Sequence, residues 1–132
     1  MKPDPFWYTP GPTMWVGPNT RVATLGNELA DKRDILVALA EQLDIPDSSP
    51  ISEMTWDDLV ALLSELDWPA VESVASVVLF HVDLPEMQDD VLAVYLDALR
   101  RALDGRGEER PRLVVAFPAE AQQRVATLTR PG

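Results

Sequence analysis

Apolar side chains recur three or four residues apart in three segments of the chain, which is the spacing that buries one face of an α-helix. The segments span residues 31–43, 55–66 and 84–105. Asp31 or Asp34 suits the N-terminus of the first helix, because a short acidic side chain can accept hydrogen bonds from the free backbone N–H groups there. We expect the buried face of that helix to consist of Ile35, Leu36, Leu39 and Leu43.

The helix at residues 84–105 is predicted to be the longest. Asp89 and Asp90 lie in its first turn and Arg100 and Arg101 in its last, an order that suits the helix dipole. Gly105 is expected to end the helix as its C′ residue. The buried face is expected to hold Met87, Val91, Val94, Tyr95, Ala98 and Leu99.

Residues 21–26, 73–82 and 112–117 have the composition of strands. The middle segment, SVASVVLFHV, is nearly all apolar, as expected of a strand buried on both faces of a sheet. The order β-α-α-β-α-β, with helices in the long connections, predicts an α/β protein: a small three-stranded parallel sheet covered by helices. Residues 118–132 are expected to add a short helix.

Residues 1–20 differ in composition from the rest and form a predicted N-terminal arm, ahead of one domain at residues 21–132. The arm holds five of the twelve prolines, which forbid a regular helix. Its four aromatic residues are too many for a solvated tail, so we expect part of the arm to lie against the domain; they are Phe6, Trp7, Tyr8 and Trp15. The alternative is that the arm serves self-association or docking on another protein.

The charge balance narrows the class of partner. Residues 31–104 carry 17 of the 22 acidic residues and 4 of the 11 basic ones, a local excess of −13. This acidic segment is expected to repel nucleic acid, because nucleic-acid binding relies on clustered Lys and Arg. Two interpretations remain: the acidity serves solubility, or it attracts a basic protein partner and raises the association rate.

The chain has no cysteine, which removes disulfides, thiolate metal ligands and Cys nucleophiles. No apolar run approaches the ~20 residues that cross a bilayer. The N-terminus has one Lys and no continuous apolar stretch, so it is a poor secretory signal. We therefore expect a cytoplasmic protein without membrane association.

Candidate catalytic residues are few. The one histidine, His81, lies in the apolar strand segment, where a hydrogen-bonded structural role is favoured over that of a general base. The adjacent acids Asp57 and Asp58, like Asp89 and Asp90, resemble an oxygen-ligand metal site. Helix neighbours point about 100° apart, so neither pair can chelate one ion alone. Nucleophile-elbow, phosphate-loop and zinc-helix motifs are missing from the sequence, so we expect no enzyme, metal or cofactor.

The stretch MTWDDLVALLSEL, residues 54–66, is the most informative one. Thr55 is predicted to be the helix N-cap, and Asp58, three residues on, to close a capping box. Apolar spacing predicts an inward face made of Trp56, Leu59, Leu63 and Leu66. The outward face is then Asp57, Ala61, Ser64 and Glu65, and capping requires no acid at Asp57.

TWDDLVALLSEL resembles the helix of the barstar family, whose members typically read G-x-N-W-D-A-L-x-D-x-L. LDIP, at residues 43–46, resembles the family's L-x-F-P before its binding loop. The strand, helix and strand predicted within residues 73–117 also follow in the family's order. The resemblance therefore covers roughly residues 21–117.

The resemblance implies a barstar-like fold and an intracellular inhibitor of a small basic secreted ribonuclease. Such an inhibitor places the carboxylates of one helix and the preceding loop where substrate phosphate would lie. Asp57 matches the family's N-W-D aspartate, Trp56 matches its buried tryptophan, and Asp97 falls near another interface acid.

The chain also departs from the family pattern. Ala61 replaces the second helical aspartate and Thr55 replaces the usual Asn; the loop at residues 44–54 is altered. Glu53, Asp58 or Glu65 are the neighbouring acids that can substitute. Alternatively, the target is a different toxin, or inhibition has been lost.

The leading hypothesis is an immunity protein or antitoxin, a monomer when free, that blocks the active site of a basic ribonuclease or toxin. Its predicted partner-binding residues are Glu53, Thr55, Asp57, Asp58, Ala61, Glu65 and Asp97. The alternative is a barstar-fold interaction module whose partner is not a ribonuclease.

Overall fold

Four strands form one parallel sheet in the computed structural model, which describes residues 6–9, 18–26, 28–45, 54–66, 68–84, 86–106 and 112–129. The strands are β1 (Trp7–Thr9), β2 (Thr20–Leu25), β3 (Ser76–His81) and β4 (Arg112–Pro118). Their order across the sheet is β1-β4-β3-β2. The α/β class and the parallel sheet are therefore confirmed, and the three predicted strand segments correspond to β2, β3 and β4.

The prediction of a three-stranded sheet is wrong, because the N-terminal arm supplies the fourth strand. β1 pairs with β4 so that Trp7 lies opposite Ala116. Phe6 is buried and meets the ring of Phe117 edge to face, with the ring centroids 5.2 Å apart. The expectation that part of the arm lies against the domain is thus confirmed. A strand of three residues in a proline-rich segment has too short a pattern to be predicted alone.

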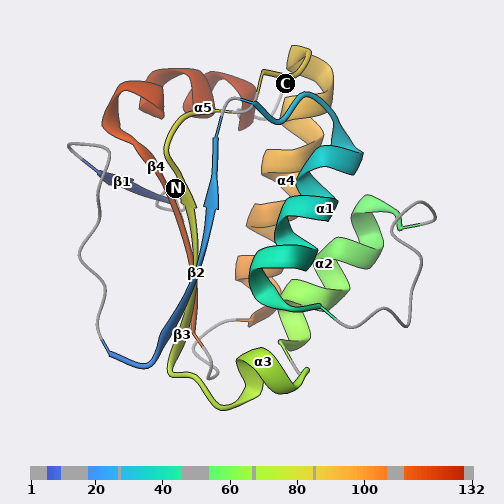
Figure 1. Ribbon diagram of the computed structural model, residues 1–132. Coiled ribbons are helices and arrows are strands. Elements are labelled where there is room, and N and C mark those ends of the chain that lie inside the picture. The colour runs from blue at the N-terminus through green and yellow to red at the C-terminus, as the bar shows by residue number, and fades with distance from the viewer. Residues whose placement is uncertain are drawn as a thin grey trace.

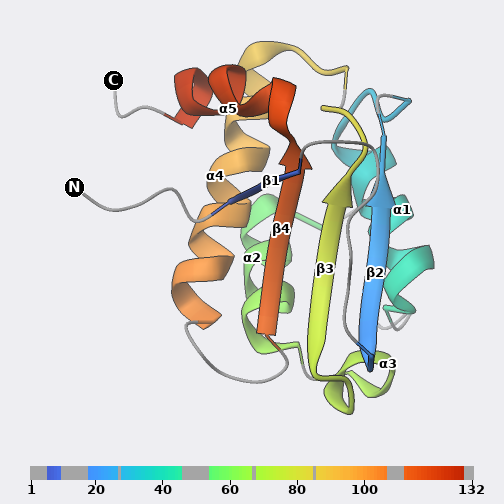
Figure 2. The same ribbon diagram turned by 90° about the vertical axis from the view of Figure 1, so that its left-hand side faces the viewer.

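The helices lie mainly on one side of the sheet, where α1, α2 and α4 form a layer (Figure 1). Their bounds are α1 (Lys32–Leu43), α2 (Trp56–Glu65), α3 (Pro69–Glu72), α4 (Asp89–Arg106), the 3-10 helix η2 (Ala119–Ala121) and α5 (Gln122–Thr129). Asp31 caps α1 by accepting a hydrogen bond from the backbone N–H of Asp34, and the predicted buried face of α1 is confirmed. Figure 2 shows the other side of the sheet, with β1 crossing in front of it.

The short helix α3 was not predicted. It begins at Pro69, where the fixed φ of proline favours the first helical position. Trp68 precedes it at the N-cap position and donates a hydrogen bond from its buried indole N–H to the carbonyl of Leu43, 2.8 Å away. This hydrogen bond joins the last residue of α1 to the segment between α2 and α3.

The buried face of α4 differs from the predicted one at Val94, whose exposure is 45%. Leu92 and Leu96 are fully buried instead. Residues two positions apart point about 200° away from each other on a helix, so Val94 and these leucines cannot share a face. Tyr95 and Leu99 are buried as predicted.

Gly105 does not end α4, which continues to Arg106, so Arg100 and Arg101 are not in its last turn. A Cβ atom at Gly105 would lie 3.0 Å from the hydroxyl of Ser64 on α2. Gly105 therefore lies inside α4, where the absence of a side chain suits the close approach of α4 to α2.

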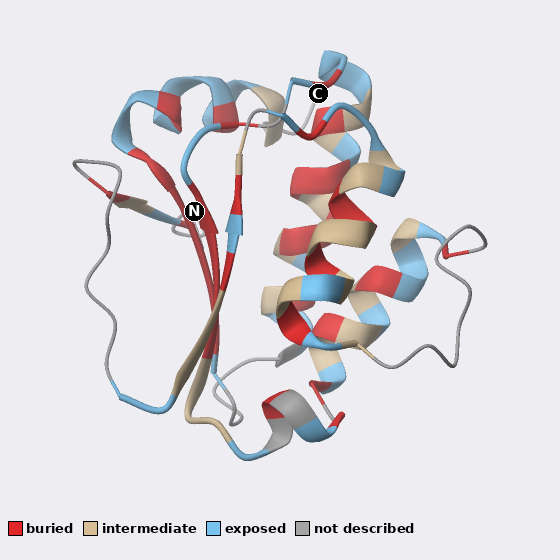
Figure 3. Ribbon diagram, in the orientation of Figure 1, coloured by how far each residue is buried: buried red, intermediate tan, exposed pale blue. Residues whose placement is uncertain are grey.

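The core fills the space between the sheet and the helix layer, where the inner sides of both are buried (Figure 3). A second, smaller cluster lies on the opposite face of the sheet and consists of Val78, Phe80, Val114 and Ala116. Val77 and Leu79 belong to the main core, so β3 is buried on both faces, as predicted.

The packing of β1 makes a stability prediction. We expect Phe6→Ala to lower the free energy of unfolding by about 3 kcal/mol, because it leaves a cavity beside Phe117. Trp7→Ala, one residue on, is the matched control; its side chain is half exposed, so the loss should stay below about 1 kcal/mol. Urea unfolding of the two variants measures both values. A loss for Phe6→Ala that stays below about 1 kcal/mol, like that of Trp7→Ala, would contradict the packing of Phe6 in the core.

Candidate functional site

The first turn of α2 is held by a complete capping box, as predicted. The hydroxyl of Thr55 accepts a hydrogen bond from the backbone N–H of Asp58 at 3.1 Å. The Oδ2 atom of Asp58 accepts one from the backbone N–H of Thr55 at 2.9 Å. Such a cap stabilises a helix by about 1 kcal/mol. Asp58 is exposed, but its carboxylate already has a structural role.

The inward side of α2 joins the core. Leu59 and Leu63 are fully buried, and Leu66, the C-cap, is 1% exposed. Trp56 is half-buried and packs against the ring of Tyr95 on α4, with the centroids 5.8 Å apart. The predicted inward face is therefore confirmed, and the outward direction of Asp57 follows from it.

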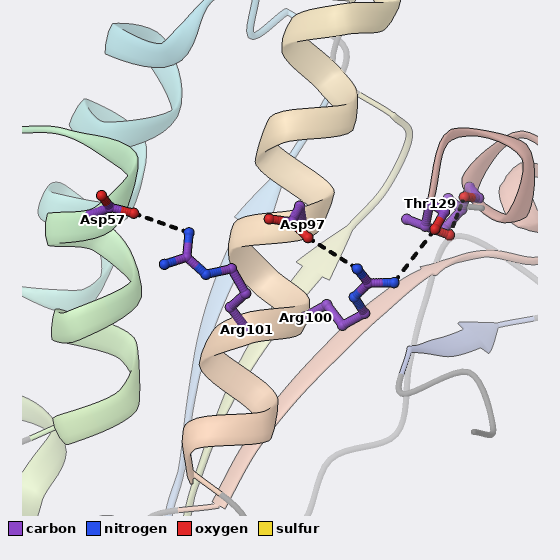
Figure 4. A network of polar contacts seen from close by, with 6 residues as sticks. Asp57, Asp97, Arg100, Arg101 and Thr129 are labelled. Carbon is purple, nitrogen blue, oxygen red and sulfur yellow. Dashed lines mark hydrogen bonds and ion pairs between the residues drawn. The ribbon is translucent and has the colours of Figure 1, made fainter. Parts of the chain in front are cut away.

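Asp57 has an ionic partner that the sequence did not indicate. Its side chain is 79% exposed, and its Oδ1 atom lies 3.0 Å from Nη1 of Arg101 on α4 (Figure 4). Capping was the only structural role weighed for Asp57 from the sequence, and this ion pair is a second one. The two residues lie 44 positions apart, so no local pattern could have revealed the pair. An exposed pair of this kind contributes about 0.2–1 kcal/mol, which leaves the carboxylate open to exchange.

The other outward residues of α2 lie as predicted, with one exception. Ala61 and Glu65 are exposed, whereas Ser64 is half-buried against Gly105. Glu53 lies outside the described residues.

Asp97 lies on α4 and is about half exposed. Its Oδ1 accepts a hydrogen bond at 3.0 Å from Nη2 of Arg100, whose Nη1 donates to the carbonyl of Thr129 at 3.4 Å. Arg101 follows Asp97 by four positions, so the two side chains are neighbours on the helix. Arg101 turns toward Asp57 on α2, whereas Arg100, the partner of Asp97, turns toward Thr129 on α5 (Figure 4).

His81 has the structural role that the sequence favours. It is fully buried and stacks on Phe117, with the ring centroids 4.2 Å apart. Its Nδ1–H donates to the carbonyl of Ala116 at 2.9 Å, since a carbonyl can only accept. Nε2 must then accept from the hydroxyl of Tyr95, 2.7 Å away. Burial lowers the pKa of His81 to about 4, so the imidazole is neutral near pH 7.

A pocket that the sequence did not indicate lies at the carboxyl ends of β2 and β3. Ligands of α/β proteins often bind at the carboxyl ends of the parallel strands. Thr24, Leu25, Gly26, Glu28, Val82 and Asp83 line it. Both of its charged residues are acidic. Within the described segments, no three His, Asp or Glu side chains are grouped so that they could hold a metal ion.

Comparisons of the chain with protein-family models, with curated proteins and with solved structures find no match. In the part of the chain that the structure describes, no helix is both long and apolar enough to cross a membrane. Function is therefore proposed from the residues and their geometry.

The buried histidine predicts a stability loss in acid. The pKa is about 4 in the folded protein and 6.5 in the unfolded chain, so the unfolded state binds more protons between these values. The contribution of His81 to stability should be complete well above pH 6.5 and should fall by about 2 kcal/mol between pH 7 and pH 5. The chain has one histidine, so its imidazole NMR signal is unambiguous. A titration midpoint near 6.5 in the folded protein would contradict this account.

Proposed function

We propose that this protein is a non-catalytic, barstar-like inhibitor that blocks a small basic ribonuclease or related toxin in the cytoplasm of the producing cell. The observation that carries the proposal is Asp57: a highly exposed carboxylate on the first turn of a helix whose opposite face is core. It is the residue that matches the interface aspartate of the barstar-like motif. Inhibition is by occlusion of the enzyme's cleft, without turnover.

Rigidity of α2 supports this proposal. The capping box fixes the N-terminus of the helix, and Leu59 and Leu63 fix its inner face. The ring contact between Trp56 and Tyr95 holds the first turn against α4. A preorganised carboxylate loses little conformational freedom on binding, so more of its interaction with a cation appears as affinity.

Charge supports it as well. The chain carries a net charge of −11 at pH 7, which attracts a basic enzyme and raises the association rate. A desolvated ion pair at a protein interface can couple by about 1.5–7 kcal/mol. A few acids on α2 and α4 are therefore enough to dominate binding.

The second acid of the interface is assigned to Asp97 in this proposal. Ala61 lies one turn after Asp57 and carries no charge, and the carboxylate of Asp58 is engaged in the cap. Asp97 is half exposed on α4, and its ion pair with Arg100 is a weak surface pair, whereas the cap of α2 depends on the carboxylate of Asp58. Asp97 can therefore exchange its partner at less cost than Asp58 can.

A second candidate function uses the other side of the molecule. Trp7 is 51% exposed on β1, at an edge of the sheet. β1 is the edge strand beside β4, and it lies away from the helix layer that contains α2 (Figure 1). Tryptophan is common at the centre of protein interfaces, so this exposed side chain supports the alternative that a protein other than a ribonuclease docks on the arm.

Charge reversal on α2 tests the leading proposal. We expect Asp57→Lys to abolish inhibition in a panel of small basic ribonucleases, because it places like charges together at the interface. Asp89→Lys is the matched control: Asp89 is 75% exposed, also pairs with an arginine, and lies twelve positions before Arg101 on α4. The control should inhibit as well as the unchanged protein. Residual activity of each enzyme at equimolar inhibitor is the measurement.

Two outcomes would contradict the proposal. If the unchanged protein leaves every ribonuclease active, inhibition of this class loses its support. If Asp57→Lys and Asp89→Lys behave alike, α2 is not the binding surface. A partner captured from the host that is lost with Trp7→Ala and kept with Asp57→Lys would favour docking through the arm.

A further inference from the structure

We propose that Arg101 is a built-in competitor for Asp57: its guanidinium occupies the position that a partner's guanidinium takes in the complex. The inference rests on the proposed binding surface and concerns how that surface is regulated. In the free protein Arg101 neutralises Asp57, and binding requires one cation to replace the other.

The geometry of the pair supports such an exchange. Nη1 of Arg101 meets Oδ1 of Asp57 at 3.0 Å, a distance typical of a charge-assisted hydrogen bond. The Arg101 side chain is 50% exposed, so water reaches its guanidinium and the long side chain has room to turn away. The capping box and the core hold the backbone of Asp57 meanwhile. The cation can therefore leave while the carboxylate stays in place.

The exchange also gives selectivity. A pair in water is weak, and a single basic side chain on another protein's surface gains little by replacing Arg101. A guanidinium that binds the carboxylate with two hydrogen bonds, inside an interface that excludes water, makes a stronger interaction. Arg101 thus discriminates against general basic surfaces and favours a partner with an arginine in a closed cleft.

A matched ion pair elsewhere on the molecule provides the control. Arg124 on α5 pairs with Asp89 at 2.8 Å, with exposures of 50% and 75%. The Arg101–Asp57 pair has exposures of 50% and 79%. Replacing either arginine by Gln removes one positive charge from a similar environment. Only the replacement at Arg101 releases Asp57.

The test measures binding of a hexa-arginine peptide at low ionic strength by NMR, at the backbone amides of residues 55–59. We expect Arg101→Gln to bind the peptide about two- to fivefold more tightly than Arg124→Gln, since one exposed ion pair no longer competes. The difference should disappear when Asp57→Asn is added to both variants. Urea unfolding confirms that the variants are folded.

Equal affinities for the two single variants would overturn the inference, as would a gain that persists with Asp57→Asn. The latter would indicate general repulsion by Arg101 and not occupation of Asp57. The peptide assay needs no ribonuclease, so it can succeed while inhibition fails. The reverse outcome is also possible: Asp57→Lys abolishes inhibition, but Arg101→Gln and Arg124→Gln bind the peptide equally well. That result would support the proposed function and reject the role of Arg101.

Discussion

The side chain of Tyr95 connects the sheet to the helix that carries the candidate site. Its ring packs against Trp56 at the start of α2, and its hydroxyl donates to His81 at the end of β3. His81 in turn donates to the carbonyl of Ala116 on β4. One buried chain of contacts thus runs from the fourth strand through the long helix to the first turn of α2. Burial raises the pKa of Tyr95, so its hydroxyl keeps the proton that this chain requires.

The connection determines what α2 can present to a partner. With Trp56 against Tyr95 and Leu59 and Leu63 in the core, Asp57 must point away from the sheet. α4 packs alongside α2, and its Arg101 reaches that carboxylate. The surface between the two helices therefore combines a fixed backbone with charges that can exchange partners. In the proposed function, this combination serves recognition of a basic protein, and the buried, doubly hydrogen-bonded His81 supports the fold.

Local patterns in the sequence were enough to predict the elements whose stability depends on residues close together in the chain. The periodicity of Leu36, Leu39 and Leu43 predicted α1, and Thr55 with Asp58 predicted the cap of α2. Contacts between distant residues were not predictable in this way. β1 pairs with β4 more than a hundred positions later in the chain, and Gly105 lies within α4 where Ser64 of α2 approaches it. The pairing of Asp57 with Arg101 belongs to the same class, which is why the sequence left Asp57 without a structural partner.

The central claim is that a basic partner covers the exposed side of α2 beside α4. Hydrogen–deuterium exchange of the protein, free and with the partner captured from its native host, tests that claim most directly. The account predicts protection at residues 55–61 and 97–101, with β1 unchanged. Protection confined to residues 7–9, with the α2 amides exchanging as they do in the free protein, would contradict it.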